Sequence, residues 1–407
     1  PTPNSPLQTP HSKLPTPMFP LLLAVPLGAV VSYLLVFALA GRLHTPRTDP
    51  TPSRWPRLAV YIPAYKEDAV IVDTARRAAQ HEYPGTFDVI VIADSMQPDT
   101  MDALRQLPVR LVEVDFANST KAKALNAALA HTDPTAYDGA VVLDADNVMA
   151  SGALAALARP LAAGETVVQG RRVAKNQETD VATLDGFSEA INNTIFRRGH
   201  RALGFSAALI GSGMAFQDDG FRAIMPEIEA VGGFDKELEL RLLRSGVRIA
   251  YAEDAVVYDE KVRDGDAFVT QRRRWIAAQA HYLRRFLGDA LRQLVTRGAV
   301  DYADKALQML LPPRAILLAV LPLLSLGSLA AGGVGWAIVW GLLTVVLIAA
   351  LLLALPADRS DLRLMHALGH LPRGIVLMAR AVLRSPGGNR TFLHTPHRTT
   401  DADITAP

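Results

Sequence analysis

The chain has 407 residues, half of them hydrophobic, and its positive mean hydropathy makes it too apolar for an ordinary soluble enzyme. Charged residues make up 20%, too many for a protein confined to the bilayer, so a globular domain with a few spanning helices is expected. The 42 basic and 40 acidic residues nearly cancel, which argues against nucleic acid as a partner, and the absence of cysteine excludes disulfides, zinc–thiolate sites and thiol catalysis.

Two features open the chain. Residues 1–18 are rich in proline, threonine and serine without periodicity, which predicts a disordered tail. Residues 19–41 carry no charge and, at about 1.5 Å per residue, are long enough to cross a hydrocarbon core of roughly 30 Å as a helix. A cleaved signal peptide is the alternative, although the apolar run is long for one. Basic residues after this segment outnumber the single lysine before it, which predicts that the downstream side is cytoplasmic.

An α/β domain with a doubly wound, mostly parallel sheet is predicted for residues 57–272. Helical segments alternate with four short runs rich in β-forming residues, at 58–63, 87–94, 109–114 and 140–144. Ligands of such sheets gather beyond the carboxyl ends of the strands. Acidic residues close or follow three of these runs: Glu67, Asp94, and Asp144 with Asp146. Each could be a helix cap alone, but convergence of three strand ends is better explained by a ligand.

The Asp144-Ala145-Asp146 tripeptide is a candidate metal site. Its spacing turns both carboxylates to the same side if the backbone stays extended. Hard oxygen ligands suit Mg²⁺ or Mn²⁺, with phosphate oxygens completing the coordination shell. Residues 121–126 open a helix between the third and fourth strands, where a lysine can neutralise a diphosphate. Taken alone, that segment is better explained as a solvated helix start.

The C-terminal part predicts further membrane contacts. Residues 273–312 are expected to form interfacial helices because arginines interleave with large apolar residues, and a core helix of the globular domain is a nearly equal alternative. Residues 314–355 divide at Gly332-Gly333 into two spanning helices. Residues 362–384 repeat the amphipathic pattern, with arginines on the cytoplasmic side. The predicted topology is a multi-pass protein of the inner (plasma) membrane with about three spans.

Together these segments resemble the membrane-bound, inverting family 2 glycosyltransferases, the group that contains cellulose, chitin and hyaluronan synthases. The resemblance covers residues 58 to 275 and implies a GT-A-like fold, a UDP-sugar donor, and Mg²⁺ or Mn²⁺ as cofactor. It assigns nucleotide binding to Pro63, Tyr65, Glu67, Asp94, Lys123, Asp144, Gln271 and Arg274, and metal binding to Asp144 and Asp146. Acceptor binding falls to Gly211, Ser212, Gly213 and Trp275, the last completing a Q-x-x-R-W motif.

The general base is where the chain departs from the family pattern. The family usually has the aspartate of an E-D or T-E-D sequence there, whereas this chain has Asp235-Lys236-Glu237. Glu237 is the predicted catalytic residue, because a glutamate can come within about 3 Å of an acceptor hydroxyl from a backbone set slightly further back. Asp235 is the rival, although capping of the following helix explains that residue somewhat better.

The final segment, residues 385–407, resembles the F-x-V-T-x-K gating loop of cellulose synthases through Phe392, Thr395 and His397, with a disordered tail as the alternative. The predicted function is transfer of a sugar from a UDP-sugar to a growing polysaccharide or oligosaccharide at the cytoplasmic membrane face. Transfer of one sugar to a lipid acceptor and a non-catalytic sugar-nucleotide sensor are the alternatives. The expected partners are the donor, a saccharide or lipid-linked acceptor and the bilayer, with a homo-oligomer as an option.

Overall fold

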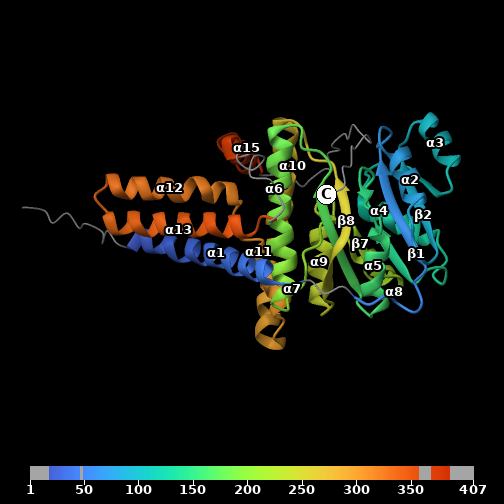
Figure 1. The fold of residues 1–407 in the computed structure, drawn as a ribbon, viewed down its shortest axis with the longest axis horizontal. Coiled ribbons are helices and arrows are strands. Elements are labelled where there is room, and N and C mark those ends of the chain that lie inside the picture. The colour runs from blue at the N-terminus through green and yellow to red at the C-terminus, as the bar shows by residue number, and fades with distance from the viewer. Residues whose placement is uncertain (1–17, 46–48, 357–367, 386–407) are drawn as a thin grey trace, which may run out of the picture.

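A computed structural model describes residues 18–45, 49–356 and 368–385. Figure 1 shows two parts: a domain built around a twisted sheet, and an arm of three apolar helices that extends from one side of it. The tail at 1–17 and the gating-like residues Phe392, Thr395 and His397 lie outside the described residues.

The sheet has eight strands in the order β3-β2-β1-β4-β7-β6-β8-β5. The strands are β1 (Leu58–Tyr65), β2 (Phe87–Asp94), β3 (Arg110–Val114), β4 (Gly139–Val142), β5 (Val148–Met149), β6 (Val167–Ala174), β7 (Met214–Gln217) and β8 (Ile249–Asp259). The first four strands in this order are mutually parallel, and β6 is parallel to β8. The predicted α/β class is confirmed.

The sheet is mixed, although four of its seven strand pairings are parallel. β7 is antiparallel to both β4 and β6, and β5 is antiparallel to β8. The chain reaches β7 at the edge where β4 ends, because Met214 pairs with Val142 and Gln217 pairs with Gly139. β7 therefore runs in the direction opposite to β4.

Helices cover both faces of the sheet. They are α2 (Ile71–Ala79), α3 (Pro98–Arg105), α4 (Lys121–Ala130), α5 (Ala153–Ala162), α6 (Asp180–Asn192), the π-helix η1 (Asn193–Gly199), α7 (His200–Ala202), α8 (Asp218–Ile224), the 3-10 turn η2 (Met225–Glu227) and α9 (Phe234–Arg244). Alternate residues of β1 serve the two faces: Tyr61 belongs to the core beneath α4 and α9, and Ile62 to the core beneath α2 and α5.

The Q-x-x-R-W motif lies on α10 (Gly265–Arg297), a single helix of 33 residues followed by α11 (Val300–Gln308). The side chain of Asp264 caps it by accepting from the backbone N–H groups of residues 266 and 267, at 2.9 and 2.8 Å. Tyr282, Phe286 and Ala290 are buried in the same core as β1. This face of α10 thus packs inside the domain, as the core-helix alternative proposed.

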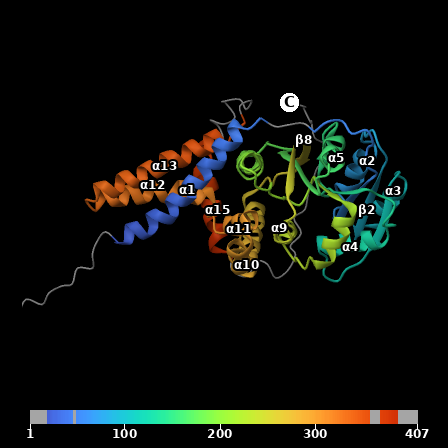
Figure 2. The same ribbon diagram turned by 90° about the horizontal axis from the view of Figure 1, so that it is seen from below.

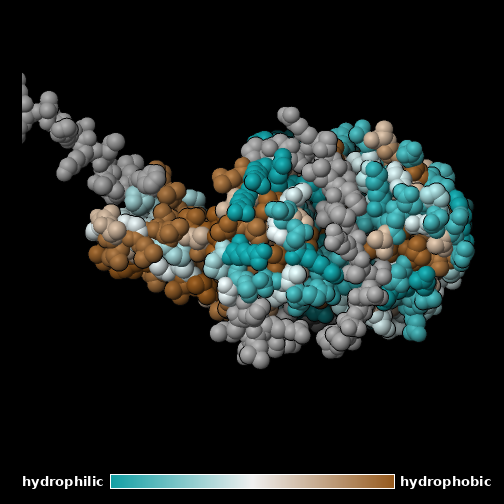
Figure 3. All heavy atoms as spheres, turned by 90° about the horizontal axis from the view of Figure 1, so that it is seen from above, coloured by the Kyte–Doolittle hydropathy of each residue, from teal (hydrophilic) through white to brown (hydrophobic). Residues whose placement is uncertain are grey.

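The arm consists of α1 (Met18–Leu43), α12 (Arg314–Ala330) and α13 (Val334–Leu353). By length and composition, α1 and α13 are candidate membrane spans, whereas α12 is a shorter apolar helix of 17 residues. The three helices bury residues such as Leu34, Leu321 and Leu347 against one another. Their outer faces remain apolar, as in Leu323, which is 65% exposed, and this surface is visible along the arm in Figure 3.

A polar cluster fixes the arm to the domain. The Tyr33 hydroxyl of α1 donates to Asp304 Oδ1 of α11 at 2.8 Å and lies 2.9 Å from His200 Nε2. The His200 ring also stacks on Phe37, with centroids 3.8 Å apart. α15 (Leu371–Leu383) then lies along α10 and α12 where the arm meets the domain (Figure 2).

Candidate active site

A cavity of about 780 Å³ begins at the carboxyl ends of β1, β2 and β4 and ends between α12, α13 and α15. Most of the residues predicted for the site line it: Pro63, Tyr65, Glu67, Asp94, Asp144, Asp146, Gly211, Asp235, Gln271, Arg274 and Trp275. Four others do not: Lys123, Ser212, Gly213 and Glu237. The fold therefore brings together segments that are more than 200 residues apart in the sequence, from the end of β1 to α10.

The acidic end of the cavity holds Asp94, Asp144 and Asp146. Asp94 is only 1% exposed, and its Oδ2 atom has no hydrogen-bond partner among the described residues. Asp146 is 5% exposed and accepts from the backbone N–H of Glu260 at 3.3 Å. Asp94 closes β2, and the other two follow β4 on the neighbouring side of β1, so parallel pairing delivers all three to one edge.

Ser212 and Gly213 support this edge from behind. Ser212 is buried and accepts from the backbone N–H of Asp144 at 2.9 Å, which holds the loop after β4 in place. Gly213 has φ +62°, and a Cβ there would lie 2.9 Å from Val257 Cγ2. The structure thus separates the predicted acceptor residues: Gly211 faces the cavity, while its two neighbours hold the backbone.

Lys121 of α4 lines the cavity, whereas the predicted Lys123 does not. Lys121 Nζ pairs with Asp144 Oδ1 and donates to the Gly211 carbonyl at 2.5 Å. Lys123 is exposed and donates to the Asn118 carbonyl at 2.8 Å. Residues two apart on a helix project about 200° from each other, so only one of this pair can face the strand ends.

The same helical geometry separates the two candidate bases on α9. Asp235 lines the cavity close to Gly211. A Cβ atom added to Gly211 would lie 3.9 Å from the Cβ atom of Asp235. Glu237 is fully buried on the opposite face, where its Oε1 atom accepts from Arg241 at 2.9 and 3.0 Å and lies 3.4 Å from Arg285 Nη1. Glu237, the predicted base, therefore does not line the cavity, because its carboxylate is enclosed by arginines on another face of α9.

The Q-x-x-R-W residues share one face of α10. Arg274 and Trp275 follow Gln271 by three and four positions, the spacing of neighbours on a helix surface. All three residues line the cavity. Burial lowers the pKa of Arg274 below its ordinary value. Arg272 pairs with Asp185, and its guanidinium carbon lies 4.1 Å from the Trp275 ring centroid. This cation–π contact holds the indole in position.

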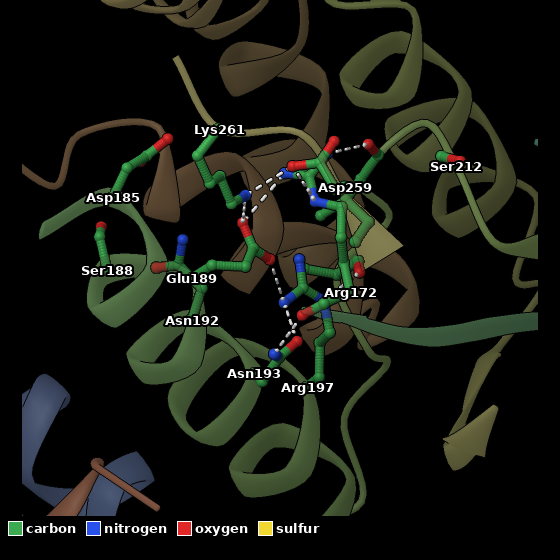
Figure 4. A network of polar contacts seen from close by, with 12 residues as sticks. Arg172, Asp185, Ser188, Glu189, Asn192, Asn193, Arg197, Ser212, Asp259 and Lys261 are labelled. Atoms are coloured by element: carbon green, nitrogen blue, oxygen red, sulfur yellow. Dashed lines mark hydrogen bonds and ion pairs between the residues drawn. The ribbon is translucent and has the colours of Figure 1, made fainter. Parts of the chain in front are cut away.

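A buried ion network forms another wall of the cavity and was missed by the sequence reasoning (Figure 4). Glu189 of α6 lies 2.9 Å from Arg172, 3.0 Å from Arg197 and 3.8 Å from Lys261. Burial alone would raise the pKa of Glu189, but these three positive charges outweigh it and lower the pKa. The available signal was weak, because Glu189 is one of several polar residues of α6 and has no motif around it.

Two carboxylates, Asp144 and Asp146, could hold a divalent cation. The described residues contain no group of three or more histidine, cysteine, aspartate or glutamate side chains arranged to hold a metal ion. Both aspartates nevertheless line the cavity, and paired hard oxygen donors fit Mg²⁺ or Mn²⁺ when phosphate oxygens supply the remaining ligands. The donor set therefore suits a cation that arrives with a phosphorylated ligand.

Comparison with known proteins places the chain in a family. Residues 56–278, more than half of the chain, match the family described as Glycosyltransferase like family 2, and the chain belongs to that family. The probable glycosyltransferase YdaM of Bacillus subtilis (strain 168) is 26% identical over 250 residues, which cover 57% of each protein. The chain thus spans little more than half the length of this curated relative.

Solved structures show partial similarity. The mannosyltransferase PcManGT from Pyrobaculum calidifontis, in complex with GDP-Man and Mn²⁺, has a TM-score of 0.49 and 19% identity, covering 82% of this chain and 96% of that chain. Glucosyl-3-phosphoglycerate synthase from Mycobacterium tuberculosis, in complex with Mn²⁺, UDP and phosphoglyceric acid, has a TM-score of 0.38 and 20% identity, covering 55% and 76%. Both scores are below 0.5, so the family assignment rests on the sequence match.

Proposed function

We propose that the chain transfers a sugar, with inversion, from a UDP-sugar to a saccharide hydroxyl at the cytoplasmic face of a membrane. The observation that carries this proposal is the single cavity in which Asp144, Asp146, Lys121, Asp235 and the Q-x-x-R-W face converge. Such a cavity offers a place for a diphosphate, a cation, a base and an acceptor ring. The apolar outer faces of α1, α12 and α13 support the membrane location.

The donor end is assigned to the strand edge. Asp94 and the loop after β1 would hold the nucleoside, while Lys121 and Arg274 would face the diphosphate. Asp144 and Asp146 would hold Mg²⁺ or Mn²⁺, which neutralises negative charge on the leaving diphosphate. A lysine and an arginine in a half-buried site add to that neutralisation without any rearrangement during the reaction.

The transfer step is assigned to Asp235. Its carboxylate takes the proton of an acceptor hydroxyl, and the oxygen attacks the anomeric carbon from the side opposite the diphosphate. The bond from the anomeric carbon to the β-phosphate oxygen breaks, and UDP leaves with the bonding electrons. Trp275 would orient the acceptor sugar by stacking, which contributes positioning rather than proton transfer.

Replacement of the two lysines of α4 tests the donor assignment. We expect Lys121→Ala to weaken UDP binding about 10- to 100-fold, the loss typical of a hydrogen bond to a charged group. Lys123→Ala, a matched change two residues away on the exposed face, should leave UDP binding unchanged. Isothermal titration of both variants with UDP and Mn²⁺ measures the difference. A larger loss in Lys123→Ala would contradict the assignment.

The reaction itself is tested with membranes containing the full chain, a panel of labelled UDP-sugars and Mn²⁺. We expect transfer of label from one sugar nucleotide, loss of transfer on chelation with EDTA, and recovery on addition of Mn²⁺ or Mg²⁺. Unchanged transfer in EDTA would remove the cation from the proposal. Absence of both UDP binding and transfer across the panel would overturn the proposed function.

A further inference from the structure

The cavity changes character along its length. Its far end is lined by aliphatic side chains of the arm and of α15: Leu318, Ile348, Leu351, Leu352, Leu377 and Met378. Ile348 and Leu352 are 43% and 51% exposed, so this end also opens toward the outer surface of the arm. A saccharide gains little from such a wall, because its hydroxyl groups would lose water without finding hydrogen-bond partners. A hydrocarbon chain is stabilised there by burial.

Arg314 lies where the polar and apolar parts of the cavity meet. It is the first residue of α12, and its Nη2 atom donates to Asn192 Oδ1 at 2.8 Å and to Ser188 Oγ at 3.0 Å. Its Nη1 atom is buried without a hydrogen-bond partner among the described residues.

Arg314 differs from the other arginines nearby in the partners of its guanidinium group. Arg272 pairs with Asp185, and Arg373 lies 3.8 Å from Asp180. Within the described part of the chain, the hydrogen bonds of Arg314 go only to neutral oxygens. A largely enclosed guanidinium without a carboxylate partner is costly unless an anion joins it, and its planar donors match phosphate geometry.

We infer that the acceptor is a lipid-linked saccharide in which a phosphate joins the hydrocarbon chain to the sugar. Three consecutive surfaces of the cavity match its three parts in order: Asp235 and Trp275 face the sugar, Arg314 binds the phosphate, and the aliphatic end holds the chain. This inference rests on the proposed function, since it names the acceptor class of the same site. The inference also distinguishes a lipid-linked acceptor from a free glycan. A free glycan would require neither the Arg314 guanidinium nor the aliphatic end of the cavity.

Binding of isoprenyl phosphates to the full chain in nanodiscs tests the inference. Farnesyl phosphate should bind, whereas farnesol, which lacks the phosphate, and dimethylallyl phosphate, which has a short chain, should each bind at least about 10-fold more weakly. Arg314→Gln should weaken farnesyl phosphate binding by about 10- to 100-fold and leave farnesol binding unchanged. Arg314→Lys should recover part of that loss because it keeps the charge.

Arg373→Gln is the matched control, because Arg373 lines the same cavity but has a side chain that is 63% exposed. It should change farnesyl phosphate binding little. UDP binding, measured in every variant, reports folding and the donor site independently. Unchanged farnesyl phosphate binding in Arg314→Gln would overturn the inference while leaving the proposed function intact. Equal displacement of the probe by dioleoyl phosphatidic acid would also overturn it, since that result marks a site for bilayer phospholipid.

Discussion

Asp235→Asn should abolish sugar transfer while UDP binding stays near that of the unchanged chain. The amide keeps the size of the carboxylate but cannot accept the acceptor proton, and general-base catalysis typically contributes about 10²- to 10⁴-fold to the rate. We therefore expect transfer to fall by at least about 100-fold, with little change in the KM for the donor. Initial rates with the active UDP-sugar, together with UDP titration, measure the two effects separately.

Glu237→Gln is the control for this experiment, since it makes the same chemical change two residues away. Glu237 is fully buried and bound by Arg241, so we expect a lower midpoint of unfolding and retained transfer. The opposite pattern, with loss of transfer in the folded Glu237→Gln protein and normal rates in Asp235→Asn, would return the base to Glu237. Loss of UDP binding in Asp235→Asn would instead indicate damage to the donor end.

Glu189→Ala should have the largest effect on stability. Its carboxylate lies within 4 Å of Arg172, Arg197 and Lys261. The side chains of Glu189 and Arg197 are both almost fully buried. Removing one partner of a buried ion pair strands the remaining charges, which typically costs about 3–5 kcal/mol. Urea unfolding of the detergent-solubilised chain, followed by tryptophan fluorescence, measures the loss.

An exposed ion pair provides the comparison. The Glu178 side chain is 62% exposed and lies 4.0 Å from Arg263, so Glu178→Ala should change the free energy of unfolding by less than about 1 kcal/mol. Glu189→Ala as mild as Glu178→Ala would show that the network contributes little to folding. Glu189 and Arg172 also line the cavity. A marked loss in the free energy of unfolding would therefore show that the network stabilises this wall of the cavity.

Much of the candidate site could be predicted, because its motifs occur in the sequence in the order typical of the family. β-forming runs predicted the first four strands, and parallel pairing of β1, β2 and β4 then placed Asp94, Asp144 and Asp146 at one edge. The family resemblance assigned Gln271, Arg274 and Trp275 to one site, and all three line the cavity. The strand ends could be predicted because the alternation of residues along a strand is a local consequence of the residue order.

The sequence alone thus determined the α/β class, the acidic strand ends and the family. Tertiary structure decided which member of each close pair lines the cavity: Lys121 rather than Lys123, and Asp235 rather than Glu237. The two members of each pair are two residues apart on a helix, so rotation of the helix about its axis decides which member points into the cavity. Only the packing of α4 and α9 against the sheet fixes that rotation. Packing likewise created the Glu189 network and brought Arg314 to the boundary of the cavity, because their partners lie on separate elements that meet only in the folded chain.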